Sequence, residues 1–282
     1  MKLFLFYQLV AFSKLIQTIG AFFWRLKLKK VDRLAIVKGK KKFFVRYGTI
    51  AQVLYCSQPM IYFNRGFEHI TLKKYQSMLF EGAVVFDIGA NVGLFSILGS
   101  DLVGESGQIW SFEPSKETFE ALKENLKLNK CENVIASPIA LADSEGVVEM
   151  VISKDSVTKG FEEDAFKYMD LSSDKTGVEY SNLDIATKRT LDAFIEEHNI
   201  KRIDVIKIDV EGAELLVFKG MEKSFKNGFL PVIVMECSER WSKRFNNTVY
   251  DTLSYLGQFG YNFEQYENEQ WVAFVANKGG LK

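Results

Sequence analysis

The stretch VVFDIGANVGLFSI, residues 84–97, joins an apolar run to a second apolar segment through a turn that holds an acid and two glycines. The first run is short and rich in β-branched residues, as in a buried strand, and the second has helical spacing. Gly89 and Gly93 permit backbone conformations that other residues avoid, and they let a ligand approach the chain closely. A strand, a glycine turn and a helix in this order predict a binding site at the carboxyl end of the strand.

Strand and helix patterns alternate after this turn, which is the rhythm of an α/β fold. The expected strands are VVFDIG (84–89), GQIWSFEP (107–114), NVIASPIAL (133–141), DVIKIDV (204–210) and PVIVMEC (231–237), and the stretch VVEMVIS (147–153) is also β-like. The expected helices are VGLFSILGSDL (92–102), SKETFEALKENLKLN (115–129), TLDAFIEEHN (190–199), AELLVFKGMEKSF (213–225) and NTVYDTLSYLGQFG (247–260). Two final strands, YNFEQYE (261–267) and QWVAFVAN (270–277), are joined too closely for a parallel crossover. The sequence predicts a doubly wound, mostly parallel seven-stranded sheet with an antiparallel closing hairpin.

The parts of the chain outside this alternation suggest a domain organisation. Residues 83–282 form the expected cofactor-binding domain, and residues 31–82, with short strand-like runs and one helical segment, form an N-terminal extension. The stretch 154–188 is polar and irregular, so we expect an insertion or a lid there.

Residues 1–30 combine an apolar stretch with the basic run RLKLKK, and three interpretations compete. A signal peptide would need a cleavage site where Trp24 and the basic run stand. A spanning helix would carry Lys14 near its centre, which costs about 3 kcal/mol on insertion scales. We favour an apolar, amphipathic helix lying on a membrane surface. Packing on the same domain or on the partner of a homodimer is the alternative.

The composition argues against several classes of protein. The chain has 36 basic and 36 acidic residues, which disfavours bulk electrostatic binding of nucleic acid, so no nucleic-acid partner is expected. Its three cysteines contain no CxxC pair, so neither a disulfide framework nor a zinc site is expected. Buried thiols indicate a reducing, cytoplasmic location, with the N-terminal helix on the inner face of the membrane.

An acid at the end of the second strand indicates what the glycine turn binds. Glu113 follows the turn by about 20 residues, where a carboxylate can accept hydrogen bonds from both hydroxyls of a ribose. The alternative is a tight turn followed by an ordinary surface glutamate. The pair of signals predicts a cofactor that contains a nucleoside.

The details of the turn separate two such cofactors. A dinucleotide site favours G-x-G-x-x-G, but here Ala90 and Asn91 follow Gly89 and the middle glycine is missing. Asp87 is a poor neighbour for a pyrophosphate and a good one for a cation, such as the ammonium or sulfonium of S-adenosylmethionine (SAM). We therefore expect SAM, with an NAD-dependent oxidoreductase as the alternative.

Further acids follow the two next strands of the predicted sheet. Asp209 and Glu211 leave the strand DVIKIDV on the same side, and Glu236 interrupts the apolar run PVIVMEC. These are candidate catalytic carboxylates because a hydroxyl acceptor must lose its proton. Glu214 begins the next helix, where a carboxylate suits the helix dipole, so we interpret it as structural. The three candidates could also hold a divalent cation, but no metal is expected.

Residues 68–276 resemble the FkbM-type, SAM-dependent methyltransferases of the class I methyltransferase fold. The resemblance rests on VVFDIGANVGLFS, SFEP, ALKENLKLN, IALADSEG, TLD and above all IKIDVEGAELLVFKG, residues 206–220. It implies that the methionine end of SAM is lined by Asp87, Gly89, Ala90, Asn91 and Gly93. It also implies that Glu113 binds the ribose, that Ala140 and Leu141 border the adenine, and that Asp209 lies near the amino group or the methyl group.

These expectations combine into a function. The leading hypothesis is an O-methyltransferase that methylates a hydroxyl of a small-molecule or glycan acceptor, above all a sugar in a glycan or glycolipid precursor. A hypothesis from another class is a non-catalytic, membrane-docked binding module that has kept the methyltransferase fold. The acids at positions 87, 113 and 209 argue against that module.

Overall fold

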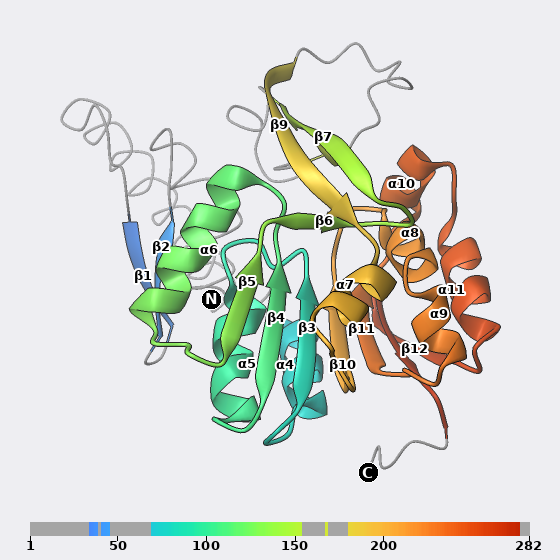
Figure 1. The fold of residues 1–282 in the computed structure, drawn as a ribbon, viewed down its shortest axis with the longest axis horizontal. Helices are drawn as coiled ribbons and strands as arrows, with labels where there is room; N and C mark the ends of the chain where they lie inside the picture. Colours follow the sequence, from blue (N-terminus) through green and yellow to red (C-terminus); the bar gives the residue numbers. More distant parts are fainter. Residues whose placement is uncertain (1–33, 39–40, 46–68, 154–166, 169–179, 277–282) are drawn as a thin grey trace, which may run out of the picture. The chain divides into compact units, whose positions relative to one another are not determined.

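The computed structural model describes residues 34–38, 41–45, 69–153, 167–168 and 180–276 (Figure 1). The chain divides into two compact units, residues 1–67 with 155–163, and residues 68–154 with 164–282. In the first unit, β1 (Leu34–Lys38) pairs antiparallel with β2 (Lys41–Val45). The predicted N-terminal helix at 1–30 lies outside the described residues.

The second unit is built on a seven-stranded sheet. Its strands are β3 (Val84–Ile88), β4 (Gln108–Phe112), β5 (Val134–Ser137), β10 (Val205–Ile208), β11 (Val232–Glu236), β12 (Asn262–Glu267) and β13 (Gln270–Phe274). Their order is β12-β13-β11-β10-β3-β4-β5. The strands from β5 to β11 pair in parallel, and β13 pairs antiparallel with both β11 and β12. This confirms the doubly wound sheet with its closing hairpin, and it brings the carboxyl ends of β3, β4, β10 and β11 to one edge.

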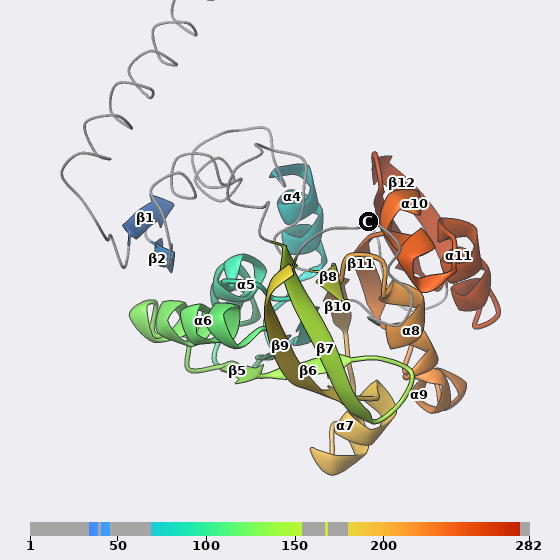
Figure 2. The same ribbon diagram turned by 90° about the horizontal axis from the view of Figure 1, so that it is seen from above.

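Helices cover both faces of this sheet (Figure 2). One face carries α4 (His69–Met78), α5 (Leu94–Val103) and α6 (Lys116–Leu128). The other carries α7 (Leu191–Glu197), α8 (Glu214–Lys219), α9 (Glu222–Lys226) and α11 (Val249–Gly257). The short α10 (Glu239–Ser242) and η3 (Lys243–Phe245) follow β11. Phe86 and Ile206 of the sheet join Phe194 and Phe218 of α7 and α8 in one extensive buried cluster.

The predicted helix over 213–225 is divided into α8 and α9. Gly220 ends α8, and a Cβ at this position would lie 2.0 Å from the carbonyl oxygen of Ala142. This close backbone contact allows only glycine, and the chain turns there before α9 begins. None of the helices in the described part of the chain is both long enough and apolar enough to cross a bilayer.

A second, four-stranded sheet corrects two expectations. It contains β6 (Ile139–Leu141), β7 (Gly146–Ser153), β8 (Lys167–Tyr168) and β9 (Tyr180–Arg189) in the order β6-β9-β7-β8. The segment 133–141, predicted as one strand, is divided at Pro138 because proline has no N–H to continue a ladder. The irregular conformation expected for 154–188 is wrong for residues 180–188, which pair along β7. Most of that segment before residue 180 lies outside the described residues.

Candidate functional site

The turn after β3 is a tight and strained cradle. Gly89, Asn91 and Gly93 have φ angles of 76°, 50° and 95°. A Cβ on Gly89 would lie 1.9 Å from the carbonyl oxygen of Asp209, because this turn packs directly against the end of β10. The backbone N–H groups of Gly89 and Ala90 both donate to the carbonyl of Phe112. The conformation therefore depends on glycine and fixes the ends of β3, β4 and β10 together.

Glu113 closes the cradle from the end of β4. Its Oε2 accepts the backbone N–H of Asn91 and its Oε1 accepts that of Ser115, each at 3.0 Å. Burial raises the pKa of its carboxyl to about 7, although both of these hydrogen bonds lower it. A carboxylate has about four acceptor positions, so this one can still accept further hydroxyl groups.

Asp87 lies behind the turn, within a buried polar row. Its side chain is fully buried, and its Oδ2 accepts a hydrogen bond from Ser96 of α5. The Ser96 hydroxyl also lies 2.6 Å from that of Ser111 on β4. Burial raises the pKa of Asp87, while the neighbouring Lys207 and the hydrogen bond from Ser96 lower it. The Asp87 carboxyl is thus held under the cradle by Ser96 of α5, with Lys207 of β10 close by.

Lys207 is a site residue that sequence reasoning missed. It stands beside Asp87 in the parallel pairing of β10 with β3, and only 5% of its surface is exposed. Its Nζ lies 3.5 Å from Oδ2 of Asp209, 4.0 Å from Oδ1 of Asp87 and 3.4 Å from the carbonyl oxygen of Gly89. The alternation of IKID was a usable signal, because a lysine two residues before Asp209 points to the same face of the strand.

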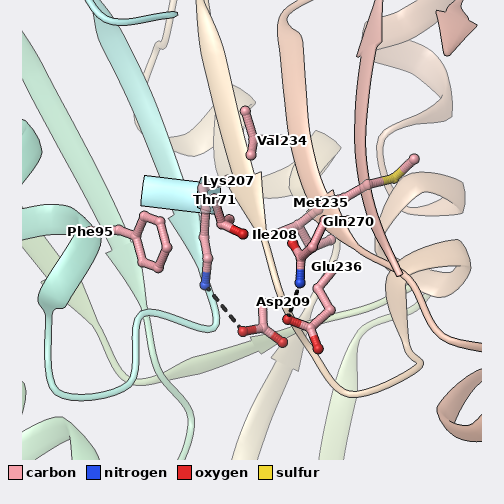
Figure 3. A pocket seen from close by; sticks show the side chains of 9 residues that line it. All are labelled: Thr71, Phe95, Lys207, Ile208, Asp209, Val234, Met235, Glu236 and Gln270. Carbon is pink, nitrogen blue, oxygen red and sulfur yellow. Dashed lines mark hydrogen bonds and ion pairs between the residues drawn. The ribbon is translucent and has the colours of Figure 1, made fainter. Parts of the chain in front are cut away.

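A pocket opens beside Lys207 at the carboxyl edge of the sheet (Figure 3). Its lining residues come from α4, α5, β10 and the residue that follows it, β11 and β13, and are Thr71, Phe95, Lys207, Ile208, Asp209, Val234, Met235, Glu236 and Gln270. Gln270, also unforeseen, donates its amide Nε2 to Oε2 of Glu236 at 2.6 Å. Two of the predicted carboxylates, Asp209 and Glu236, therefore line one pocket.

Glu211 occupies the turn that follows β10. Its side chain is exposed, it does not line the pocket, and its φ of 55° is unusual for a non-glycine residue. Glu214 braces this turn, because its Oε1 accepts the backbone N–H groups of Val210 and Gly212, both at 3.2 Å. Glu214 is thus a support for the turn, consistent with the structural role predicted for it.

Ala140 and Leu141 lie on β6, where both side chains are buried. Leu141 belongs to the buried cluster that contains Phe86 and Phe194, and Ala140 packs with Ala186 of β9. In the described structure these two side chains serve packing. Across the described ranges, no group of three or more histidine, cysteine, aspartate or glutamate side chains is placed to hold a metal ion.

Comparison with known proteins identifies the class to which this fold and site belong. Residues 87–263 match the family described as the methyltransferase FkbM domain. The sheet has the topology of a Rossmann-like class I methyltransferase. The chain belongs to the FkbM methyltransferase domain family.

Particular relatives are similar at the level of sequence. Methyltransferase sdnD of Sordaria araneosa is 29% identical over 49% of this chain and 60% of its own length. The 31-O-demethyl-FK506 methyltransferase FkbM of Streptomyces tacrolimicus is 29% identical over 50% of this chain and 60% of its own length. Hexuronic acid methyltransferase AglP of Haloferax volcanii is 27% identical over 52% of this chain and 53% of its own length. The chain thus spans about 60% of the length of two of these relatives.

Two solved structures are similar in outline. A putative rRNA-methylase from Clostridium thermocellum aligns with a TM-score of 0.44 at 10% identity, over 74% of this chain and 95% of its own. The putative methyltransferase SMU.1697c from Streptococcus mutans, in complex with SAH, aligns with a TM-score of 0.42 at 8% identity, over 73% and 94%.

The residues of the site fit SAM, the cofactor indicated by the family. The contact between Gly89 and Asp209 leaves a bare backbone cradle, as close approach to a ligand requires. Glu113 offers acceptors of the kind that a ribose diol needs. The surplus of acids around Lys207 suits a ligand that carries net positive charge. When bound, SAM would supply an electrophilic methyl group on a sulfonium.

The affinity for SAM is expected to fall as the pH falls below 7. The Glu113 carboxyl has a pKa of about 7 in the folded protein, so it becomes protonated in that range and has fewer lone pairs to offer a ribose. If one linked proton is responsible, the dissociation constant should rise by up to about tenfold per pH unit below 7. Titration calorimetry between pH 5.5 and 8.5 measures this change, and Glu113→Gln should remove most of it. An equal slope in the wild type and the variant would contradict the assignment.

Proposed function

We propose that this protein is a SAM-dependent O-methyltransferase that methylates a hydroxyl of a sugar in a glycan or glycolipid precursor. The observation that carries the proposal is the pocket in which Asp209 and Glu236 meet, beside the glycine cradle. The name of the hexuronic acid methyltransferase supports a sugar acceptor, and that of the 31-O-demethyl-FK506 methyltransferase supports O-methylation.

The chemistry follows from the placement of the carboxylates. A hydroxyl acceptor that receives a methyl group would have to give its proton to a base within hydrogen-bond reach. Glu236 is held at this end of the pocket by Gln270, and Asp209 is held by Lys207. We assign to Glu236 the role of accepting the proton, and to Asp209 the role of orienting the cofactor. Glu211, exposed on the adjoining turn, is a candidate for contact with the acceptor outside the pocket.

Label transfer from methyl-labelled SAM tests the proposal. The acceptors would be a panel of neutral methyl hexosides and methyl hexuronides, together with a lipid-linked glycan extract. Wild-type protein should transfer label to at least one of them, and Glu236→Gln should lower the rate by about 10²-fold or more, as expected for loss of a general base. Glu132→Gln, which changes an exposed carboxylate after α6, is the matched control and should keep full activity.

The alternatives give different results in the same experiments. Binding of NAD but not SAM in calorimetry would favour an oxidoreductase. Tight SAM binding with no transfer to any fraction would favour a non-catalytic module. Sedimentation with anionic vesicles, with and without residues 1–30, tests the proposed contact with the inner face of a cytoplasmic membrane. Gel filtration tests the proposed homodimer.

A further inference from the structure

Lys207 holds a cation where an apolar strand residue would be expected. Neighbouring positions Ile206 and Ile208 are fully buried on the opposite face of β10. The lysine stem passes the ring of Phe95, whose centroid lies 4.7 Å from Nζ, and its end reaches the pocket (Figure 3). Burying a charge in a central strand is costly unless other groups compensate for the lost water. The role of Lys207 therefore depends on what its ammonium group contacts.

The ammonium group of Lys207 has protein acceptors around it and the pocket beside it. Asp87 and Asp209 lie within 4.0 Å of Nζ, and the carbonyl oxygen of Gly89 lies at 3.4 Å. All three distances exceed the 2.7–2.9 Å or so that is typical of hydrogen bonds between opposite charges. A ligand oxygen that came closer would form a stronger hydrogen bond than any of these three contacts. The ammonium also lies on the pocket wall, so such an oxygen can reach it from the open side.

The pair formed by Lys207 and Asp209 matches a zwitterion. An α-amino acid carries an ammonium and a carboxylate on the same carbon, so it needs an acceptor and a cation side by side. Here the cation of Lys207 and the carboxylate of Asp209 are 3.5 Å apart, and the carbonyl of Gly89 is a second acceptor for an ammonium. The methionine half of SAM ends in this headgroup. We propose that Lys207 binds the carboxylate of the cofactor's amino acid headgroup, an inference that rests on the proposed use of SAM.

The competing explanation is that Lys207 only neutralises Asp87. A counter-ion of that kind would affect every cationic ligand in the same sense. Removal of Lys207 would make the site more negatively charged. Any cationic ligand would then bind more tightly, whether or not the ligand carries a carboxylate. A ligand that lacks the carboxylate therefore separates the two explanations.

Titration calorimetry with SAM and decarboxylated SAM tests the proposal. The proteins are the wild type, Lys207→Met and Lys207→Arg, with Lys123→Met on the exposed surface of α6 as a matched control. Lys207→Met should weaken SAM by roughly 10–100-fold, the effect of one charged hydrogen bond of about 1.5–3 kcal/mol. The same variant should bind decarboxylated SAM as tightly as the wild type or more tightly. Lys207→Arg should retain most of the preference for SAM.

The outcomes distinguish this inference from the proposed function. If wild-type protein binds no SAM, the proposed function fails first. If it binds SAM and Lys207→Met binds SAM equally well or better, only the role of Lys207 is overturned. Should Lys207→Met fail to fold, as judged by circular dichroism, the wild type and Lys207→Arg still decide. Equal affinity of both for SAM and decarboxylated SAM would also overturn the proposal.

Discussion

Gly89→Ala is expected to abolish SAM binding and to destabilise the protein by more than 3 kcal/mol, roughly the cost of two strained features together. Gly89 has a φ of 76°, and its missing Cβ would lie 1.9 Å from the carbonyl oxygen of Asp209. That oxygen belongs to the backbone at the end of a central strand, so it cannot move away as a flexible side chain would. The turn would have to separate from β10, and the cradle would be lost with it.

A matched control separates the close contact from the effect of backbone conformation. Gly228 has a φ of 84°, similar to that of Gly89, but a Cβ there would meet nothing within 4 Å. Gly228→Ala should therefore cost only about 1–2 kcal/mol, the ordinary penalty of a left-handed residue. Chemical denaturation and calorimetry with SAM measure both variants. Equal destabilisation by the two substitutions would show that the contact with Asp209 does not determine the fold of the turn.

Residues at strand ends could be predicted from sequence because a parallel sheet brings all its carboxyl ends to one edge. Gly89, Glu113, Asp209 and Glu236 each interrupt or follow an apolar run, and chain topology alone predicts that they lie near one another. The structure places the first three around the cradle and the last two in one pocket. Whether each contacts cofactor or acceptor stays a prediction.

Other features depend on contacts that sequence patterns do not specify. Lys207 was overlooked because a lysine inside a strand usually points to solvent, whereas here Asp87 of the neighbouring strand makes its burial possible. The register between β3 and β10 decides this pairing, and neither segment reveals it alone. Likewise, the division at Gly220 depends on the backbone of Ala142, which lies far away in the sequence.

Glu214→Ala should destabilise the protein by roughly 2–6 kcal/mol, the penalty for leaving two buried backbone N–H groups unpaired. Those groups belong to Val210 and Gly212, which flank the strained Glu211. Glu214→Gln keeps an oxygen that can accept from both groups, so at pH 5 it should be close to the wild type in stability. The loss in the alanine variant would extend to the turn that carries Asp209, and SAM affinity should fall with it.

The wild type and Glu214→Gln should differ in how their stability depends on pH. Burial raises the pKa of Glu214 from 4.5 to about 7. Because the folded pKa is the higher one, the stability due to the protonated group is fully present below pH 4.5 and is lost as the pH rises to about 7. A shift of this size corresponds to about 3 kcal/mol, and glutamine cannot ionise. Glu214→Gln should therefore become more stable than the wild type by up to about this amount at pH 8. Denaturation at pH 5 and pH 8 measures the difference, and the same gap between the two proteins at both values would exclude ionisation of Glu214 as its cause.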